Sequence, residues 1–177
     1  MGDERRFGEE GGVGFSTILC ALDLTEASRE ALETALELGA AFGARVYAVH
    51  VLDQPCLRPE EELVVSDQAG LARELEEQAR ERFGALLAAA GIARERVAGF
   101  FVRRGDTVEE LVDEAQRLEA DLIVVRTHGR RGIDRYLQRS VAEQLLERAG
   151  PPVLALRPRE AGEVEDDEDD EGPSARG

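Results

Sequence analysis

The chain has 177 residues, of which 42% are hydrophobic and 34% are charged. This length predicts one domain with an apolar core over residues 15–158, after a flexible arm at 1–14. No run approaches the ~20 apolar residues of a membrane span, which argues against an integral membrane protein. The first fifteen residues lack the apolar stretch of a signal peptide, so we expect a cytoplasmic protein.

The net charge is −16, from 38 acidic and 22 basic residues, and every basic residue is an arginine. An acidic chain is a poor match for phosphate backbones, which disfavours nucleic acid as a partner. Residues 159–177 hold nine acids against two arginines, and we expect this tail to be disordered. Without lysine the chain cannot form a Schiff base or complete a phosphate loop of the G-x-x-x-x-G-K-[ST] type.

Several classes of site are disfavoured by what the sequence lacks. Two cysteines and two histidines are too few for a zinc centre, and we expect no metal site. Cys20 lies in an apolar stretch and should be inert, and His50 lies within a strand pattern as a paired core residue. No G-x-S-x-G or G-x-G-x-x-G segment follows an apolar strand, which argues against a hydrolase triad and an ordinary dinucleotide site.

Short apolar runs alternate with helical periodicity from Phe15 onward. The predicted strands are 15–22, 45–51, 97–102, 121–125 and 153–156. The predicted helices begin at Thr25, at 66 or 67, at Thr107 (with Glu110 in a capping box) and at Ser140. Buried strands that alternate with helices predict a parallel sheet covered on both faces, with ligands at the carboxyl ends of the strands.

The segment 126–140 is the strongest candidate for a binding loop, because it carries five arginines and leads into a helix. Backbone N–H groups at the helix start, the Ser140 hydroxyl and the arginines favour an anion, most simply phosphate. The alternative is that the arginines pair with surface acids on an exposed loop. Asp23, directly after the first strand, is placed either to bind a ribose or base, or to cap the next helix or form a turn.

Three stretches together resemble a known family: ILCALDLTEASREALETA (18–35), VRRGDTVEELVDEAQRLEADLIVVRTHG (102–129) and RSVAEQLLERAGPPVLAL (139–156). The chain from about Phe15 to Pro158 resembles a universal stress protein domain. The resemblance implies an α/β, three-layer Rossmann-like (adenine nucleotide alpha hydrolase-like) fold with a five-stranded parallel sheet in the order 3-2-1-4-5. It also implies a cytoplasmic homodimer paired through the last strand, Val153–Leu156.

ATP-binding members of this family carry the motif G-x2-G-x9-G-[ST]. Laid on this sequence, its three glycines fall at Arg126, Gly129 and Arg139, followed by Ser140, so two of the three glycines are arginine. The resemblance implies base and ribose contacts at Ala21, Asp23 and Val51. It implies phosphate contacts at Gly129, Arg130, Ser140 and Val141, and His128 lies in the same loop.

The two arginines predict a degenerate nucleotide site. Arg139 puts a side chain where phosphates approach the backbone, and Arg126 crowds the nucleoside side, although arginine also binds phosphate bidentately. The first hypothesis is a dimeric stress-response regulator that acts through protein partners without efficient catalysis. The alternative is an ATP-binding sensor or slow ATPase that uses the loop 126–141 and Asp23, with Mg²⁺ held only together with nucleotide. The acidic tail is either a solubilising segment or a phosphate mimic that shields the arginine loop.

Overall fold

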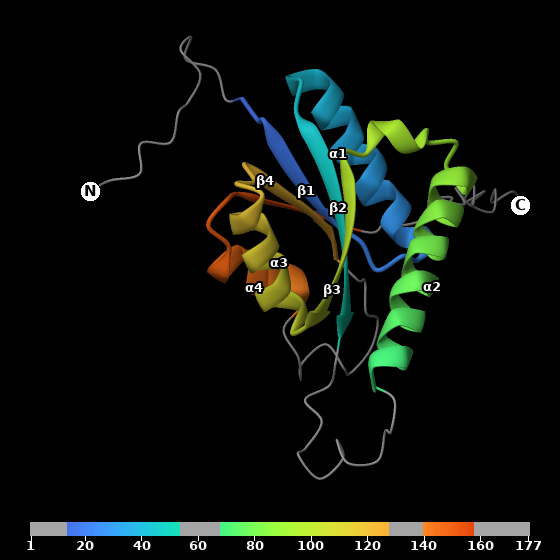
Figure 1. Ribbon diagram of the computed structural model, residues 1–177. Helices are drawn as coiled ribbons and strands as arrows, with labels where there is room; N and C mark the ends of the chain where they lie inside the picture. The colour runs from blue at the N-terminus through green and yellow to red at the C-terminus, as the bar shows by residue number, and fades with distance from the viewer. Residues whose placement is uncertain (1–13, 54–67, 128–139, 158–177) are drawn as a thin grey trace, which may run out of the picture.

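Five parallel strands form one sheet in the order β3-β2-β1-β4-β5, which confirms the predicted topology (Figure 1). The computed structural model describes residues 14–53, 68–127 and 140–157. The strands are β1 (Thr17–Ala21), β2 (Arg45–Asp53), β3 (Gly99–Gly105), β4 (Leu122–Arg126) and β5 (Val153–Leu156). The helices are α1 (Arg29–Phe42), α2 (Gln68–Ala89), α3 (Thr107–Arg117) and α4 (Val141–Arg148), with short 3-10 turns at η1 (Glu26–Ser28) and η3 (Arg94–Arg96).

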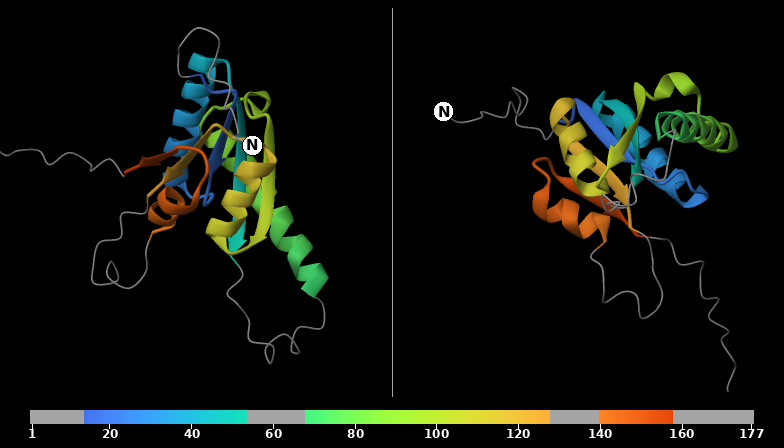
Figure 2. Two further views of the ribbon diagram at one scale, coloured as in Figure 1. Left: turned by 90° about the vertical axis from the view of Figure 1, so that its left-hand side faces the viewer. Right: turned by 60° about the horizontal axis from the view of Figure 1, so that its bottom comes forward.

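Helices cover both faces of the sheet, α1 and α2 on one side and α3 and α4 on the other (Figure 2). Alternate residues of each strand point to opposite faces, so Ile18 and Cys20 join the core under α1 and α2 while Leu19 joins the core under α3 and α4. These two layers of apolar side chains explain why the strands read as continuous hydrophobic runs in the sequence.

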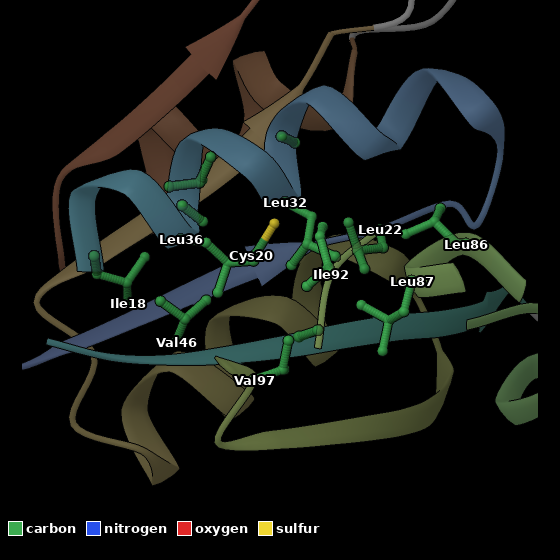
Figure 3. Close-up of a cluster of buried hydrophobic side chains, with 14 of the residues drawn as sticks. Ile18, Cys20, Leu22, Leu32, Leu36, Val46, Leu86, Leu87, Ile92 and Val97 are labelled. Atoms are coloured by element: carbon green, nitrogen blue, oxygen red, sulfur yellow. The ribbon is translucent and has the colours of Figure 1, made fainter. Parts of the chain in front are cut away.

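The core under α1 and α2 is built from β1, β2, β4 and the two helices, and Cys20 lies at its centre (Figure 3). Burial raises the pKa of the Cys20 thiol far above its ordinary value because no water reaches the sulfur to stabilise a thiolate. The expectation that Cys20 is an inert core residue therefore fits its surroundings. No helix in the described residues is long and apolar enough to cross a membrane.

Two helix caps differ from the sequence prediction, although α3 does begin at Thr107 as predicted. Asp106, not Thr107, caps α3: its carboxylate accepts hydrogen bonds from the N–H groups of Val108 and Glu109, both at 3.0 Å. The predicted capping box of Thr107 and Glu110 is therefore wrong. Thr25 precedes η1 without a side-chain capping bond, and α1 begins only at Arg29. At α3 the aspartate before Thr107 accepts the bonds expected of the threonine, whereas at Thr25 the hydroxyl donates to Asp23.

Strand β3 is displaced along the chain from its predicted range of 97–102. It runs from Gly99 to Gly105 and pairs with β2 as far as Asp53. The prediction stopped before Arg103 and Arg104 because charged residues rarely occupy buried strands. β3 is an edge strand, and its arginines reach solvent and helix acids at the margin of the sheet, as edge strands allow.

Candidate functional site

The carboxyl ends of the central strands bring together the base- and ribose-site positions expected from the sequence. Ala21 ends β1 and pairs with Val49 of β2 and Val125 of β4, while Val51 lies two residues further along β2. Ala21, Val51 and Val141 all pack at the margin of the α3/α4 core. These three positions therefore lie on the same side of the sheet, the side covered by α3 and α4.

Asp23 is held by the turn that follows β1. Its Oδ1 accepts hydrogen bonds from the backbone N–H and the hydroxyl of Thr25, at 2.9 and 2.7 Å. Leu24 between them has a positive φ of 58°, a conformation that costs energy for a residue with a branched side chain. The carboxylate is thus fixed in place by its own turn, which removes much of the entropy cost of ordering it on a ligand.

His50 secures the same turn from the neighbouring strand. Its Nδ1 lies 2.8 Å from the carbonyl oxygen of Leu22, and because a carbonyl only accepts, Nδ1 carries the proton and donates. The backbone N–H of Leu22 in turn donates to Val49 at 2.9 Å. The expectation that His50 is a paired structural histidine is confirmed, and its partner is the residue directly before Asp23.

Arg126 does not occupy the face that carries Ala21 and Val51. Its Nε lies 3.6 Å from Glu30 Oε2 on α1, so the side chain extends toward the opposite side of the sheet. That Nε is buried and makes no hydrogen bond within the described residues. The prediction that Arg126 crowds the nucleoside side therefore lacks support from the geometry, because the side chain leaves that side.

The start of α4 differs from the open anion site expected there. Ser140 caps the helix with its hydroxyl accepting from Glu143 N–H, and Glu143 Oε2 accepts from Ser140 N–H, each at 3.1 Å. The carboxylate of Glu143 thus occupies a donor that a phosphate would need, and it adds a negative charge at the positive end of the helix dipole. The S-x-x-E spacing of these two residues signals this capping box in the sequence.

The other candidate loop residues, His128, Gly129, Arg130 and Arg139, lie outside the described residues. Among the residues that are described, no group of three His, Cys, Asp or Glu side chains is placed to hold a metal ion. A shallow hollow of about 270 Å³, bordered by Leu24, Arg29 and Arg82, lies between the start of α1 and the second half of α2. It opens on the α1/α2 side, away from Ala21 and Val51.

Comparison with known proteins identifies the family. A model of the universal stress protein family matches residues 14–157. The chain belongs to this family. Universal stress protein A homolog 1 of Coxiella burnetii is 30% identical over 142 residues, which cover 80% of this chain and 96% of that protein.

Solved structures of universal stress proteins share the fold. One from Lactobacillus plantarum has a TM-score of 0.60 at 21% identity and covers 82% of this chain and 100% of its own. Another, a universal stress protein in complex with cAMP, has a TM-score of 0.53 at 22% identity, covering 81% of this chain and 97% of that one. These likenesses show the Rossmann-like fold with the sheet order described above.

An ion cluster between α3 and the edge strand β3 was missed by the sequence prediction. Glu114 of α3 is 1% exposed, and its Oε2 accepts from Arg103 Nε at 2.6 Å and from Arg117 Nη1. Its Oε1 is also buried and has no hydrogen-bond partner within the described residues. The available sequence signal was weak: Glu114 falls on the apolar stripe of α3 between Leu111 and Ala115, where an acid is unexpected.

Proposed function

We propose that this universal stress protein is a cytoplasmic, dimeric regulator that acts through protein partners, without efficient catalysis, and keeps only a weakened nucleotide site. The site lies at the carboxyl ends of β1, β2 and β4, with Asp23 as its ribose ligand. Partners of a regulator bind its surface, so catalytic side chains are not required for this role. The cAMP complex of a structural neighbour supports an adenine nucleotide as the class of ligand.

The capping box at the start of α4 is the main evidence that nucleotide binding is weakened. A phosphate at this helix start would have to displace the Glu143 carboxylate from Ser140 N–H, or lie beside it. Either course costs energy, since a hydrogen bond is lost or two negative charges approach each other. Phosphate affinity is therefore lower than at a helix start whose N–H groups are all open.

Of the two arginines that replace motif glycines, Arg139 is the one that we expect to obstruct a nucleotide. Arg126 extends toward Glu30 on the far side of the sheet, so its replacement by glycine removes no obstacle on the Ala21 face. Arg139 directly precedes the helix cap, where the family motif has glycine. We propose that Arg139 is the residue that keeps phosphates from the backbone.

Equilibrium dialysis with labelled ATP and labelled cAMP tests this site. We expect weak binding by the unaltered chain, stronger binding by Arg139→Gly, and no gain in the matched control Arg126→Gly. Glu143→Gln should also strengthen ATP binding, because it removes the negative charge at the cap. Tight ATP binding by the unaltered chain that is lost in Arg139→Gly would contradict the steric argument.

A slow ATPase is the second candidate, favoured by the fixed carboxylate of Asp23. Phosphate release from ATP and Mg²⁺, followed over hours, separates the two candidates. The regulator should release no more phosphate than an Asp23→Asn variant. Release that falls in Asp23→Asn, while the thermal stability of the variant stays unchanged, would favour the ATPase.

The homodimer is proposed to form through β5, which is an edge strand with half-exposed residues. The carbonyls of Pro152 and Leu156 accept from β4, so by alternation the N–H groups of Val153 and Ala155 point to the open edge. Ala155→Pro removes one outward donor and leaves the bonds to β4 intact. Sedimentation should show a dimer for the unaltered chain and a shift toward monomer for Ala155→Pro. A dimer of equal strength in both would exclude strand pairing at this edge.

A further inference from the structure

A row of aromatic rings and guanidinium groups lies on β2 and β3, on the side of the sheet that carries α3. We call Arg45, Tyr47, Phe101, Arg103 and Arg117 the arginine–aromatic face. The Tyr47 and Phe101 rings are stacked with centroids 6.0 Å apart. Arg45 Cζ lies 5.7 Å from the Tyr47 centroid, and Arg103 Cζ lies 4.9 Å from the Phe101 centroid.

This face lies at the open margin of the sheet. β3 is an edge strand and α3 packs over β2 and β3, so both rings stay half-buried (Figure 1). The Tyr47 ring covers Gly99, where an added Cβ would lie 3.1 Å from the ring. Glycine at this position leaves room for the Tyr47 ring against β3.

The arginine–aromatic face is positive although the chain carries −16 overall. Within the part of the chain that the structure describes, these arginines form ion pairs with one acid, Glu114, which is buried beneath Arg103 and Arg117. A single carboxylate balances only one of the three arginines. Arg117 is 58% exposed, and Arg45 is exposed and forms no ion pair with any described residue. The exposed surface therefore presents uncompensated guanidinium donors beside aromatic rings, a combination suited to carboxylates.

We propose that this face binds the acidic stretch 163–171 of the same chain. Eight of these nine residues are Asp or Glu, the densest run of negative charge in the sequence. Guanidinium groups bind carboxylates bidentately, and the rings supply a partly dry floor that strengthens each pair. The interaction is independent of the proposed nucleotide site, since none of its residues takes part there.

The length of the chain allows this contact. Leu156, the last residue of β5, lies level with Val102 of β3 through the register of the sheet, four strand spacings away. Four spacings are roughly 19 Å. The segment from 158 to 171 has 14 residues, and a flexible chain of that length spans roughly 21 Å. The acidic stretch can thus reach Arg103 and Arg117 without unfolding any described element.

Tyr47 provides a reporter on the face itself. The chain has no tryptophan and two tyrosines, so Tyr136→Phe leaves Tyr47 as the sole fluorophore of this class. In this background, acrylamide quenching measures access to the Tyr47 ring. Neutralising the eight acids of 163–171 to Asn and Gln should raise the Stern–Volmer constant about twofold, and about 0.5 M salt should do the same to the acidic chain, because it shortens the Debye length below about 5 Å.

Arginine variants test the site of contact. Arg45→Gln combined with Arg117→Gln should raise quenching as the neutral tail does, and adding the neutral tail should then change nothing further. Arg82→Gln, which removes the same charge from an exposed position on α2 across the sheet, serves as the control and should leave quenching unchanged. Equal quenching with acidic and neutral tails overturns the proposal. Protection that disappears on dilution overturns it as well, since the acids would then come from a second copy.

Discussion

The two faces of the sheet are closed by different means. Under α1 and α2 the contact is apolar and tight, so close at Gly39 that an added Cβ would lie 2.6 Å from Val46 Cγ2. Under α3 and α4 an apolar floor surrounds the buried Glu114, and the candidate site positions lie at its margin. The first face holds the larger apolar core, while the second also buries a carboxylate between its arginines.

The largest expected effect is a loss of stability when an apolar side chain under α4 is shortened. It tests whether the stability of the α3/α4 face depends on apolar burial. Leu145 of α4 is fully buried, whereas its neighbour Leu146 is 60% exposed. Leu145→Ala should lower the free energy of unfolding by about 3 kcal/mol, and Leu146→Ala by less than about 0.5 kcal/mol. Urea unfolding of both variants measures the contrast. Equal losses would mean that α4 does not contribute to the core as described.

The second effect concerns the buried acid that distinguishes the α3/α4 face. Glu114→Gln leaves Arg103 and Arg117 without a counter-charge and should cost about 2 kcal/mol, less than a fully buried pair because Arg117 is largely exposed. Glu109→Gln, on the exposed side of the same helix and 3.4 Å from Arg148, is the matched control. Chemical denaturation should show almost no change for the control. A neutral Glu114→Gln would mean that the ion cluster contributes nothing to stability.

A third test measures how tightly α1 lies on the opposite face. Gly39→Ala should destabilise the protein by about 1–2 kcal/mol, because the new methyl group meets Val46 and the carbonyl of Ala44. Gly84→Ala on α2, where a Cβ meets nothing within 4 Å, should instead stabilise by about 0.5–1 kcal/mol through helix propensity. Thermal unfolding of both variants shows whether each substitution raises or lowers the stability. If Gly39→Ala also stabilises, α1 is packed more loosely than described.

The smallest effect is a pH dependence at the rim of the α1/α2 face. The hydrogen bond from Arg104 lowers the pKa of Glu76 below its ordinary value of 4.5. A lowered pKa contributes stability that is present above the unfolded value and lost as pH falls through the folded value. The difference in Tm between the unaltered chain and Glu76→Gln should therefore be largest at neutral pH and shrink below about 4.5.

Glu77→Gln is the control for this titration. It removes the same charge from the neighbouring exposed position of α2 and leaves Glu76 and Arg104 in place. Subtracting its effect isolates the pair from the general repulsion of an acidic chain. A Glu76→Gln difference that grows as the solution is acidified would contradict the assigned direction of the shift.

Hydrophobic patterning predicted the elements of this fold, and the family resemblance predicted their order. All five strands and four helices are present, because each buries a stripe or run that is visible in the sequence. The wrong cap of α3 and the displaced ends of β3 share one cause. At Thr107 and in β3 the deciding residues are polar ones, Asp106 and Arg103, whose roles depend on hydrogen bonds and on an edge position that a one-dimensional pattern does not contain.

The sequence predicted where some of the candidate site residues lie, but not how their side chains are oriented. Ala21, Asp23 and Val51 lie near one another because strand ends in a parallel sheet share one edge. The direction of the Arg126 side chain could not be predicted, since it depends on Glu30 across a helix–sheet contact. The role of Glu143 could have been predicted from its S-x-x-E spacing with Ser140. The same capping-box rule had been applied to Thr107 and Glu110, where it was wrong.

The reactivity of Cys20 can report how often the α1/α2 face opens. Its thiol is fully buried beneath α1, and only a thiolate exposed to water reacts with a disulfide reagent. When Cys56, the second cysteine of the chain, is replaced by serine, each labelling event requires α1 to separate from the sheet. The labelling rate then reports how often this opening happens. Slower labelling in the presence of a nucleotide or partner would measure how strongly that ligand stabilises the packing of α1 on the sheet.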